Sequence, residues 1–264
     1  MNADREDRLR YILRTLLAER QEYRSTEIPE SREERRRLMR ALLNVRPPLA
    51  VSDEFLTAQD EELQEQLAEK GVVELDDIPI RTKYPRLRLW QGDITRLRVD
   101  AITNAANSRM LGCFIPLHGC IDNAIHSAAG VQLRAECRRM MEKQGHPEPT
   151  GCAKLTRGYN LPARYVLHTV GPIVPDGIPT QEQERQLSDC YRSCLELADR
   201  HALGSIAFCC ISTGEFRFPN RSAARIAVAA VTGYLESHPA TTLGTVLFNV
   251  FKDEDYLIYE QLLG

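Results

Sequence analysis

Apolar residues near the N-terminus recur at spacings of three and four, which places them on one face of a helix. The repeat is carried by Leu9, Ile12, Leu13, Leu16 and Leu17. This spacing predicts an amphipathic helix whose apolar face packs against another element.

Two further helices are predicted before residue 80. Ser31 followed by Glu34 resembles a capping box, and Pro47 with Pro48 ends the helix that it starts. The next helix should begin near Ser52 and Asp53 and end at Gly71, with three leucines directed inward: Leu56, Leu63 and Leu67. Residues 1–80 are therefore predicted to form a helical N-terminal extension. We expect it to cap the main domain, with recognition of a protein substrate as the alternative.

From about residue 86 the pattern changes to short apolar segments that alternate with amphipathic ones. Strands are predicted at 86–91, 101–104, 154–159, 165–170, 205–211 and 245–251. Helices are predicted at 121–129, 131–143, 181–201, 222–237 and from 254 onward. This alternation predicts an α/β domain over residues 81–264, with helices on both faces of a mostly parallel sheet.

Composition narrows the classes of function. The 264 residues carry a formal net charge of −3, which argues against a broad nucleic-acid-binding surface. No apolar run reaches the roughly 18 residues that span a bilayer, and the N-terminus is charged. We therefore expect an intracellular, cytoplasmic protein with no membrane partner and no direct nucleic-acid partner. In such a protein the eight cysteines should be reduced.

Three segments follow predicted strands with residue types that suit a ligand, at the sheet edge where α/β proteins bind theirs. Residues 92–95 contain Asp93, which can accept from an exocyclic amine or cap a turn. Residues 104–107 contain Asn104 and Asn107, which suit a hydroxyl-rich ligand or an ordinary polar loop. Residues 211–216 offer small residues whose amides can cradle a diphosphate.

The most distinctive stretch runs from Gly112 to His126. Cys113, His118 and Cys120 form a C-x4-H-x-C pattern just before a predicted helix. Two thiolates and an imidazole are ligands that zinc prefers, and three protein ligands leave a fourth position for water or substrate. Packed, metal-free cysteines are the alternative on the residues alone. In the same region Asp122 and His126 share a helix face, and His168 is expected to be a core residue.

Seven segments, in order and spacing, resemble the macrodomain family. They are GDIT at 92–95, VDAI at 99–102, NAAN at 104–107, DNAIHSAAG at 122–130, GYNLP at 158–162, VLHTVGP at 166–172 and ISTG at 211–214. In hydrolytic macrodomains a glycine-rich loop leads into the helix that bears the active-site Asp. Here residues 112–120, the cysteine-containing loop, take its place, and this departure is similar to the zinc-dependent branch of the family. The implied fold is a three-layer α/β/α macrodomain with a mixed, mostly parallel sheet.

The resemblance implies an ADP-ribose site. It places Asp93 and Ile94 at adenine, and Asn107 and Asp122 beside the distal ribose. It places at the diphosphate and distal ribose Ser212, Thr213, Gly214, Glu215 and Phe216.

It also implies a zinc ion held by Cys113, His118 and Cys120. The implied reaction is removal of mono-ADP-ribose from modified proteins, with Asp122 activating water and Asn107 holding a ribose hydroxyl. The alternatives are a non-catalytic ADP-ribose reader with a structural zinc ion, and a hydrolase of small ADP-ribose derivatives.

Overall fold

The computed structural model describes residues 2–81 and 83–264. Its helices are α1 (Asn2–Ala18), α2 (Arg32–Val45), α3 (Asp53–Lys70), α4 (Ile121–Ala129), α5 (Val131–Gln144), α6 (Gln181–Arg200), α7 (Asn220–Ser237) and α8 (Asp253–Leu263). Its strands are β1 (Val73–Glu74), β2 (Leu87–Gln91), β3 (Leu97–Arg98), β4 (Ala101–Ala106), β5 (Ala153–Arg157), β6 (Tyr165–Val170), β7 (Ser205–Phe208) and β8 (Thr245–Val250).

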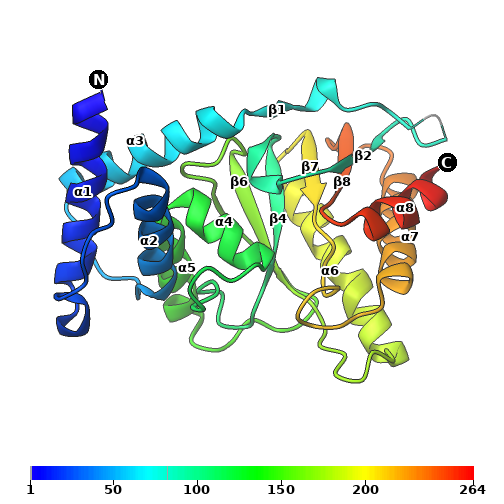
Figure 1. Cartoon of the computed structure of the whole chain (residues 1–264). Helices are drawn as coiled ribbons and strands as arrows, with labels where there is room; N and C mark the ends of the chain where they lie inside the picture. The colour runs from blue at the N-terminus through cyan, green and yellow to red at the C-terminus, as the bar shows by residue number, and fades with distance from the viewer. Residues whose placement is uncertain (1, 82) are drawn as a thin grey trace.

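Six strands form the central sheet in the order β2-β8-β7-β4-β6-β5. The first five run parallel, and β5 pairs antiparallel with β6. Helices α4 and α5 cover one face, and α6, α7 and α8 cover the other (Figure 1). This is the α/β/α arrangement with a mixed, mostly parallel sheet that the alternating pattern predicts.

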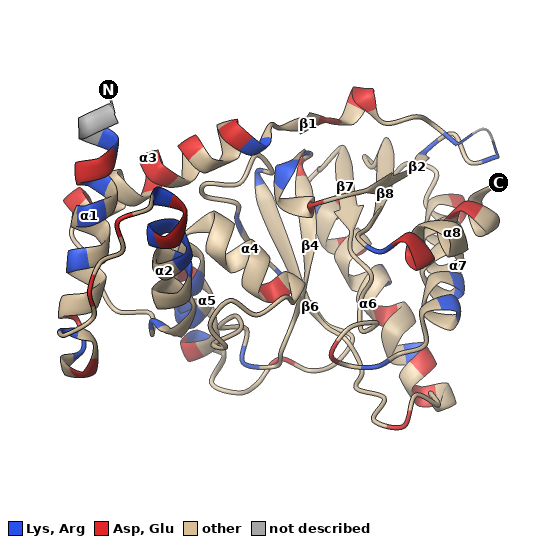
Figure 2. Cartoon of the chain, in the orientation of Figure 1, with Lys and Arg blue, Asp and Glu red and all other residues tan. Residues whose placement is uncertain are grey.

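The inner strands are almost without charge, since β4, β6, β7 and β8 contain no Asp, Glu, Lys or Arg. Figure 2 shows these strands in tan, with the charged residues on the helices and loops around them. Strands covered on both faces must be apolar, because a charge buried there would lose its hydration. Among the described residues, no helix is both long and apolar enough to cross a membrane.

The helices α1, α2 and α3 pack around an apolar cluster of their own, in which Leu9, Ile12, Met39 and Phe55 are almost fully buried. They lie beside α4 and α5, at the N-terminal end of the molecule in Figure 1. Their contacts with α5 and the loop that precedes β6 are largely polar. For example, Gln59 Oε1 accepts from Val131 N at 3.0 Å.

Three sequence predictions are wrong in detail. In α3, Leu56 and Leu67 are only half-buried, and the inward face is formed by Phe55, Leu63 and polar residues such as Glu62. Glu62 is fully buried because arginines of α1 and α2 pair with its carboxylate.

Two strands end earlier than predicted. The strand starting at Ser205 stops at Phe208 rather than at residue 211, because Cys209 N donates to Thr103 Oγ1 at 2.9 Å instead of continuing the ladder. The strand predicted to reach residue 159 stops at Arg157, because Gly158 N donates across a turn to Arg164 O at 2.8 Å.

Candidate functional site

A cleft of about 1870 Å³ opens at the carboxyl ends of the parallel strands. The segments that leave β2, β8, β7, β4 and β6 all line it. Residues that follow these strands stand side by side along the sheet edge, namely Asp93, Phe251, Ser212, Asn107 and Gly171. The structure therefore brings the three predicted strand-exit segments into one site.

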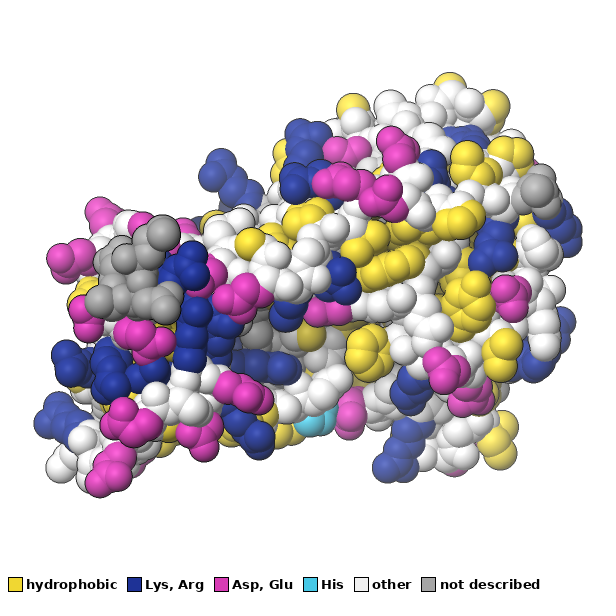
Figure 3. All heavy atoms as spheres, turned by 45° about the horizontal axis from the view of Figure 1, so that its top comes forward, with side chains coloured by type: hydrophobic (Ala, Val, Ile, Leu, Met, Phe, Trp, Pro, Cys, Tyr) yellow, Lys and Arg dark blue, Asp and Glu magenta, His cyan; other side chains and the backbone are white. Residues whose placement is uncertain are grey.

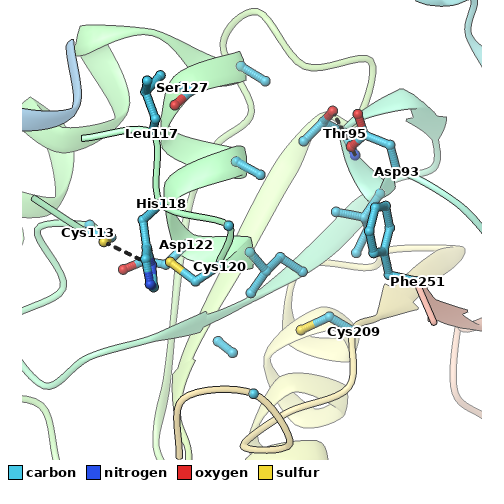
Figure 4. Close-up of a pocket in the computed structure, with 18 of the residues that line it drawn as sticks. Asp93, Thr95, Cys113, Leu117, His118, Cys120, Asp122, Ser127, Cys209 and Phe251 are labelled. Atoms are coloured by element: carbon cyan, nitrogen blue, oxygen red, sulfur yellow. Dashed lines mark hydrogen bonds between the residues drawn. The ribbon is translucent and has the colours of Figure 1, made fainter. Parts of the chain in front are cut away.

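The cysteine-containing loop forms one wall of this cleft. Cys113, His118 and Cys120 are each half-buried, and their ligand atoms lie within 4.8 Å of one another. Cys113 Sγ is 3.6 Å from His118 Nδ1. Figure 4 shows the three side chains converging next to Asp122. Residues spaced as C-x4-H-x-C thus meet at one point.

The donor set fits a zinc ion by its chemistry, since two sulfurs and one imidazole nitrogen converge and leave room for a further ligand from the cleft. Burial, with the neighbouring Cys113 thiol, raises the pKa of Cys120 to about 12. A protonated thiol must lose its proton when a metal binds, so binding there would release protons. On the other side of the imidazole, His118 Nε2 lies 3.5 Å from Glu215 Oε1. That carboxylate can orient the ring, as partners of metal-binding histidines do.

Asp122 lies in the first turn of α4, two residues after the N-cap Cys120. Burial raises the pKa of its carboxyl to about 6, against a hydrogen bond from Asn104 Nδ2 to its Oδ1 at 2.8 Å. Asn104 Nδ2 also lies 3.0 Å from His168 Nδ1. Asn104 is fully buried, so it supports Asp122 and cannot contact a ligand. Its position in the strand-exit segment predicts a ligand-facing side chain, and for Asn104 that prediction is wrong.

His126 and His168 lie behind Asp122 in the core. His126 Nε2 is 3.5 Å from Asp122 Oδ1, and both histidines are buried. Burial lowers the pKa of His168 to about 3 and that of His126 well below its ordinary value. His168 Nε2 is 2.9 Å from Thr156 Oγ1, which agrees with the core role predicted for it.

Asn107 lies at the start of the loop after β4. Its Nδ2 donates to Gly112 O at 3.2 Å and is 3.4 Å from Asp122 Oδ2. Its Oδ1 accepts from Arg109 N at 3.0 Å. The side chain therefore spans the carboxylate and the start of the cysteine-containing loop.

The loop after β7 presents free amides to the cleft. In the part of the chain that the structure describes, the amides of Thr213, Gly214, Glu215 and Phe216 donate no hydrogen bond. Ser212 is 5 % exposed with φ +65°, and among the described residues its Oγ has no partner. Successive unpaired amides form a concavity that suits phosphate oxygens.

At the other end of the cleft, Asp93 caps a short 3-10 turn, Ile94–Arg96. Its Oδ1 accepts from Thr95 N at 3.0 Å and Thr95 Oγ1 at 2.6 Å. Asp93 therefore acts as a turn cap, and its Oδ2, 3.5 Å from Lys70 Nζ, still faces the cleft. Ile94 is buried beneath it.

Sequence reasoning missed two groups of residues that line the cleft. Phe251 follows β8, is 76 % exposed and lies beside Asp93 (Figure 4). An exposed aromatic at a strand exit is the signal that could have identified it. The second group comes from α2 and α3 and includes Arg36, Arg40 and Lys70. Basic side chains gather on this part of the surface in Figure 3, but no motif in the sequence distinguishes them.

Comparison with known proteins finds relatives of this chain both by sequence and by structure. A sequence model described as "Macro domain" matches residues 103–227. A protein named Protein-ADP-ribose hydrolase from Treponema medium is 47% identical over 261 residues, which is 98% of this chain and 99% of that protein. One of the same name from Staphylococcus aureus strain Mu50 is 48% identical over 258 residues, covering 97% and 95% of the two chains.

Solved structures agree with the sequence relatives. The Trypanosoma brucei macrodomain in complex with ADP-ribose has a TM-score of 0.67 and 33% identity, covering 89% of this chain and 97% of that one. The Oceanobacillus iheyensis macrodomain with ADP has a TM-score of 0.60 and 39% identity, covering 67% and 89%. The fold predicted from the sequence is confirmed by these similarities.

Proposed function

This chain belongs to the macrodomain family, and from that premise we propose that it is a hydrolase that removes mono-ADP-ribose from modified proteins with the help of zinc. The observation that carries the proposal is the convergence of Cys113, His118 and Cys120 beside Asp122, inside the cleft at the sheet edge. A protein that only binds ADP-ribose, without hydrolysing it, would need the cleft but no reactive centre. A carboxylate next to a set of metal donors is what a hydrolytic centre needs.

ADP-ribose would lie along the sheet edge, from Asp93 to the cysteine-containing loop. Adenine would bind at Asp93 and Ile94, with the face of Phe251 beside it. The free amides of residues 213–216 would donate to the diphosphate, and a ligand oxygen would give Ser212 Oγ the partner it lacks among the described residues. The net charge of −3 fits such binding, because amides rather than a basic surface hold the phosphates.

The distal ribose would then lie against Asp122, Asn107 and the cysteine-containing loop. Asp122 is held on Oδ1 by Asn104, so its Oδ2 is the oxygen that can orient or deprotonate a water. The Asn107 amide, whose contact with Oδ2 is long at 3.4 Å, can exchange it for a ribose hydroxyl. Remote binding of the adenosine diphosphate moiety would place the anomeric carbon at these groups.

The proposed zinc ligands are Cys113, His118 and Cys120. A zinc ion held there would supply a Lewis acid beside the distal ribose. The chain's own contribution is to fix the donors, with Glu215 orienting the His118 ring and Asp122 remaining free for the water.

The test is release of ADP-ribose from proteins modified through Asp or Glu, Ser and Arg, measured together with metal content and ADP-ribose affinity. We expect turnover by the zinc-loaded protein, loss of turnover after chelation, and its return when zinc is added. Cys120→Ala and Asp122→Ala should each abolish turnover, and Asp122→Ala should retain zinc.

Three results would contradict parts of the proposal. ADP-ribose binding with no release from any linkage would identify a reader. Full activity in metal-free protein would remove zinc from the reaction while leaving hydrolysis in place. Turnover confined to small ADP-ribose esters would exclude proteins as the substrate.

A further inference from the structure

Asn44 of α2 contacts the cysteine-containing loop directly. Its side chain is 1 % exposed, its Oδ1 accepts from Leu117 N at 2.9 Å, and its Nδ2 donates to Ser127 Oγ of α4 at 2.9 Å. Leu117 precedes the proposed ligand His118 and has φ +56°, a left-handed conformation that non-glycine residues rarely adopt. Asn44 thus binds the backbone of the loop at its most strained position.

Arg40, one helical turn earlier in α2, contacts the next residue of the loop. Its Nη2 donates to His118 O at 3.2 Å and to Asn123 Oδ1 at 2.9 Å. Asn123 in turn donates from Nδ2 to Ile115 O at 3.0 Å and from its backbone N to Cys120 Sγ at 3.4 Å. Arg40 therefore contacts the backbone of one proposed ligand, His118, directly and reaches a second, Cys120, through Asn123.

The C-terminal end of α2 is joined to the start of the same loop through Arg134 of α5. This guanidinium is almost fully buried and donates to Leu43 O at 2.9 Å and to Leu111 O at 2.7 Å. It also lies 4.3 Å from the ring centroid of Phe114. The loop is thereby held at both ends against α2, although the two segments are more than 70 residues apart in the chain.

These contacts matter because the loop has little structure of its own. A backbone hydrogen bond from His118 N to Ile115 O closes one turn, whereas most of its other contacts are made by side chains of α2, α4 and α5. Asn107 and Glu215 add one contact each, to Gly112 O and to the His118 ring. Phe114 and Ile115 are partly exposed. Three donors on such a loop bind a metal more tightly when neighbouring groups fix them in place before binding.

We propose that Asn44 and Arg40 are positioning residues for the metal donors, so that the N-terminal helices are a working part of the active site. The inference rests on the proposed zinc function. It assigns the extension a role that neither a passive cap nor a surface for the protein substrate would have.

The experiment measures zinc affinity of the full chain by competition with a chelator, and the visible absorption of the Co²⁺-substituted protein. Asn44→Ala and Arg40→Ala should each weaken zinc binding about 10–100-fold, as loss of groups behind metal ligands does, and should alter the cobalt bands. Arg40→Lys keeps one donor and should recover part of the affinity. If Asn44→Ala fails to fold, the two Arg40 variants still decide the matter.

Arg32→Ala is the matched control. Arg32 is also an arginine of α2, but its ion pairs all run to glutamates of α3, namely Glu62, Glu65 and Glu69. Its loss should leave zinc affinity and the cobalt spectrum unchanged. Wild-type zinc affinity and cobalt bands in both Asn44→Ala and Arg40→Ala, with zinc lost in Cys120→Ala, would overturn the positioning role alone. A wild-type protein that binds no zinc would overturn the zinc function as well.

Discussion

Gly171, the first residue after β6, should be essential for the shape of the proposed diphosphate site, which lies on a different strand exit. A methyl group added at Gly171 would come 2.0 Å from Ser212 Oγ and 2.9 Å from Ile211 Cγ2. Both distances are far below van der Waals contact. Gly171→Ala therefore requires the side chains of Ser212 and Ile211, at the start of the loop after β7, to shift.

The structure indicates that this movement is costly. Ser212 is buried, has φ +65°, and its carbonyl accepts from Phe218 N at 2.9 Å, so the residue is fixed from two sides. Overpacking of this kind costs about 1–3 kcal/mol. If the loop moves to relieve it, the same amount is lost from ligand binding, which corresponds to roughly 5–150-fold weaker affinity for ADP-ribose.

Isothermal titration calorimetry with ADP-ribose would measure this loss in a double-mutant cycle with Ser212→Gly. Removing the Ser212 side chain eliminates the closest contact, so Gly171→Ala should weaken binding much less in that background. Gly233→Ala is the control, since a methyl there meets open space on α7 and should leave affinity unchanged. Equal losses in both backgrounds, or none in either, would refute the steric coupling between the two strand exits.

Three further predictions concern other parts of the chain. Phe251→Ala should reduce ADP-ribose affinity by about 1–3 kcal/mol, as expected for a lost base–aromatic stack, without changing metal content; unchanged affinity in a calorimetric titration would place adenine elsewhere. Glu62→Gln should destabilise the N-terminal helices by about 3 kcal/mol, because a buried carboxylate would no longer balance the arginines around it; a loss below about 1 kcal/mol in urea unfolding would contradict this. Burial lowers the pKa of His168 to about 3. Below about pH 6.5, His168 therefore binds a proton in the unfolded chain but remains neutral in the folded chain. The contribution of His168 to the free energy of unfolding is therefore complete above that pH. It should fall by about 1.4 kcal/mol per pH unit as the pH drops towards 3. His168→Gln should remove that part of the slope in unfolding measured at pH 7, 6 and 5, and an unchanged slope would show that His168 is not held neutral.

The strands and helices could be predicted because each depends on a local pattern. The buried strands β4, β6 and β8 are short apolar runs, and α4 and α5 are separated by Gly130, which has φ +92°. The end of β7 was predicted wrongly because a long-range hydrogen bond replaces a ladder bond there. The bond from Cys209 N to Thr103 Oγ1, which ends β7, joins residues that are 106 positions apart. No local pattern could have revealed it.

The residues of the site also fall into those that a local sequence pattern predicts and those that depend on long-range contacts. The cysteine-containing loop could be found because its donors are close in the sequence, and the strand exits because parallel strands end at one edge. The role of Asn104 could not be predicted, since an Asn in a strand faces a ligand or the core depending on its neighbours. Its amide faces Asp122 and His168 because α4 and β6 lie on either side of it.

The N-terminal helices show most clearly where sequence patterns stop being informative. Their leucine spacing indicates only that they pack on something, and their arginines are typical of a solvated helix surface. In the structure, charges of the same type have different roles along α2. Arg32 pairs within the extension, whereas Arg40 reaches His118 O and Asn123. The difference comes from where each turn of α2 faces once it is packed against α4. A helix that the sequence pattern identifies only as an attachment thus supplies contacts to the loop on which the proposed chemistry depends.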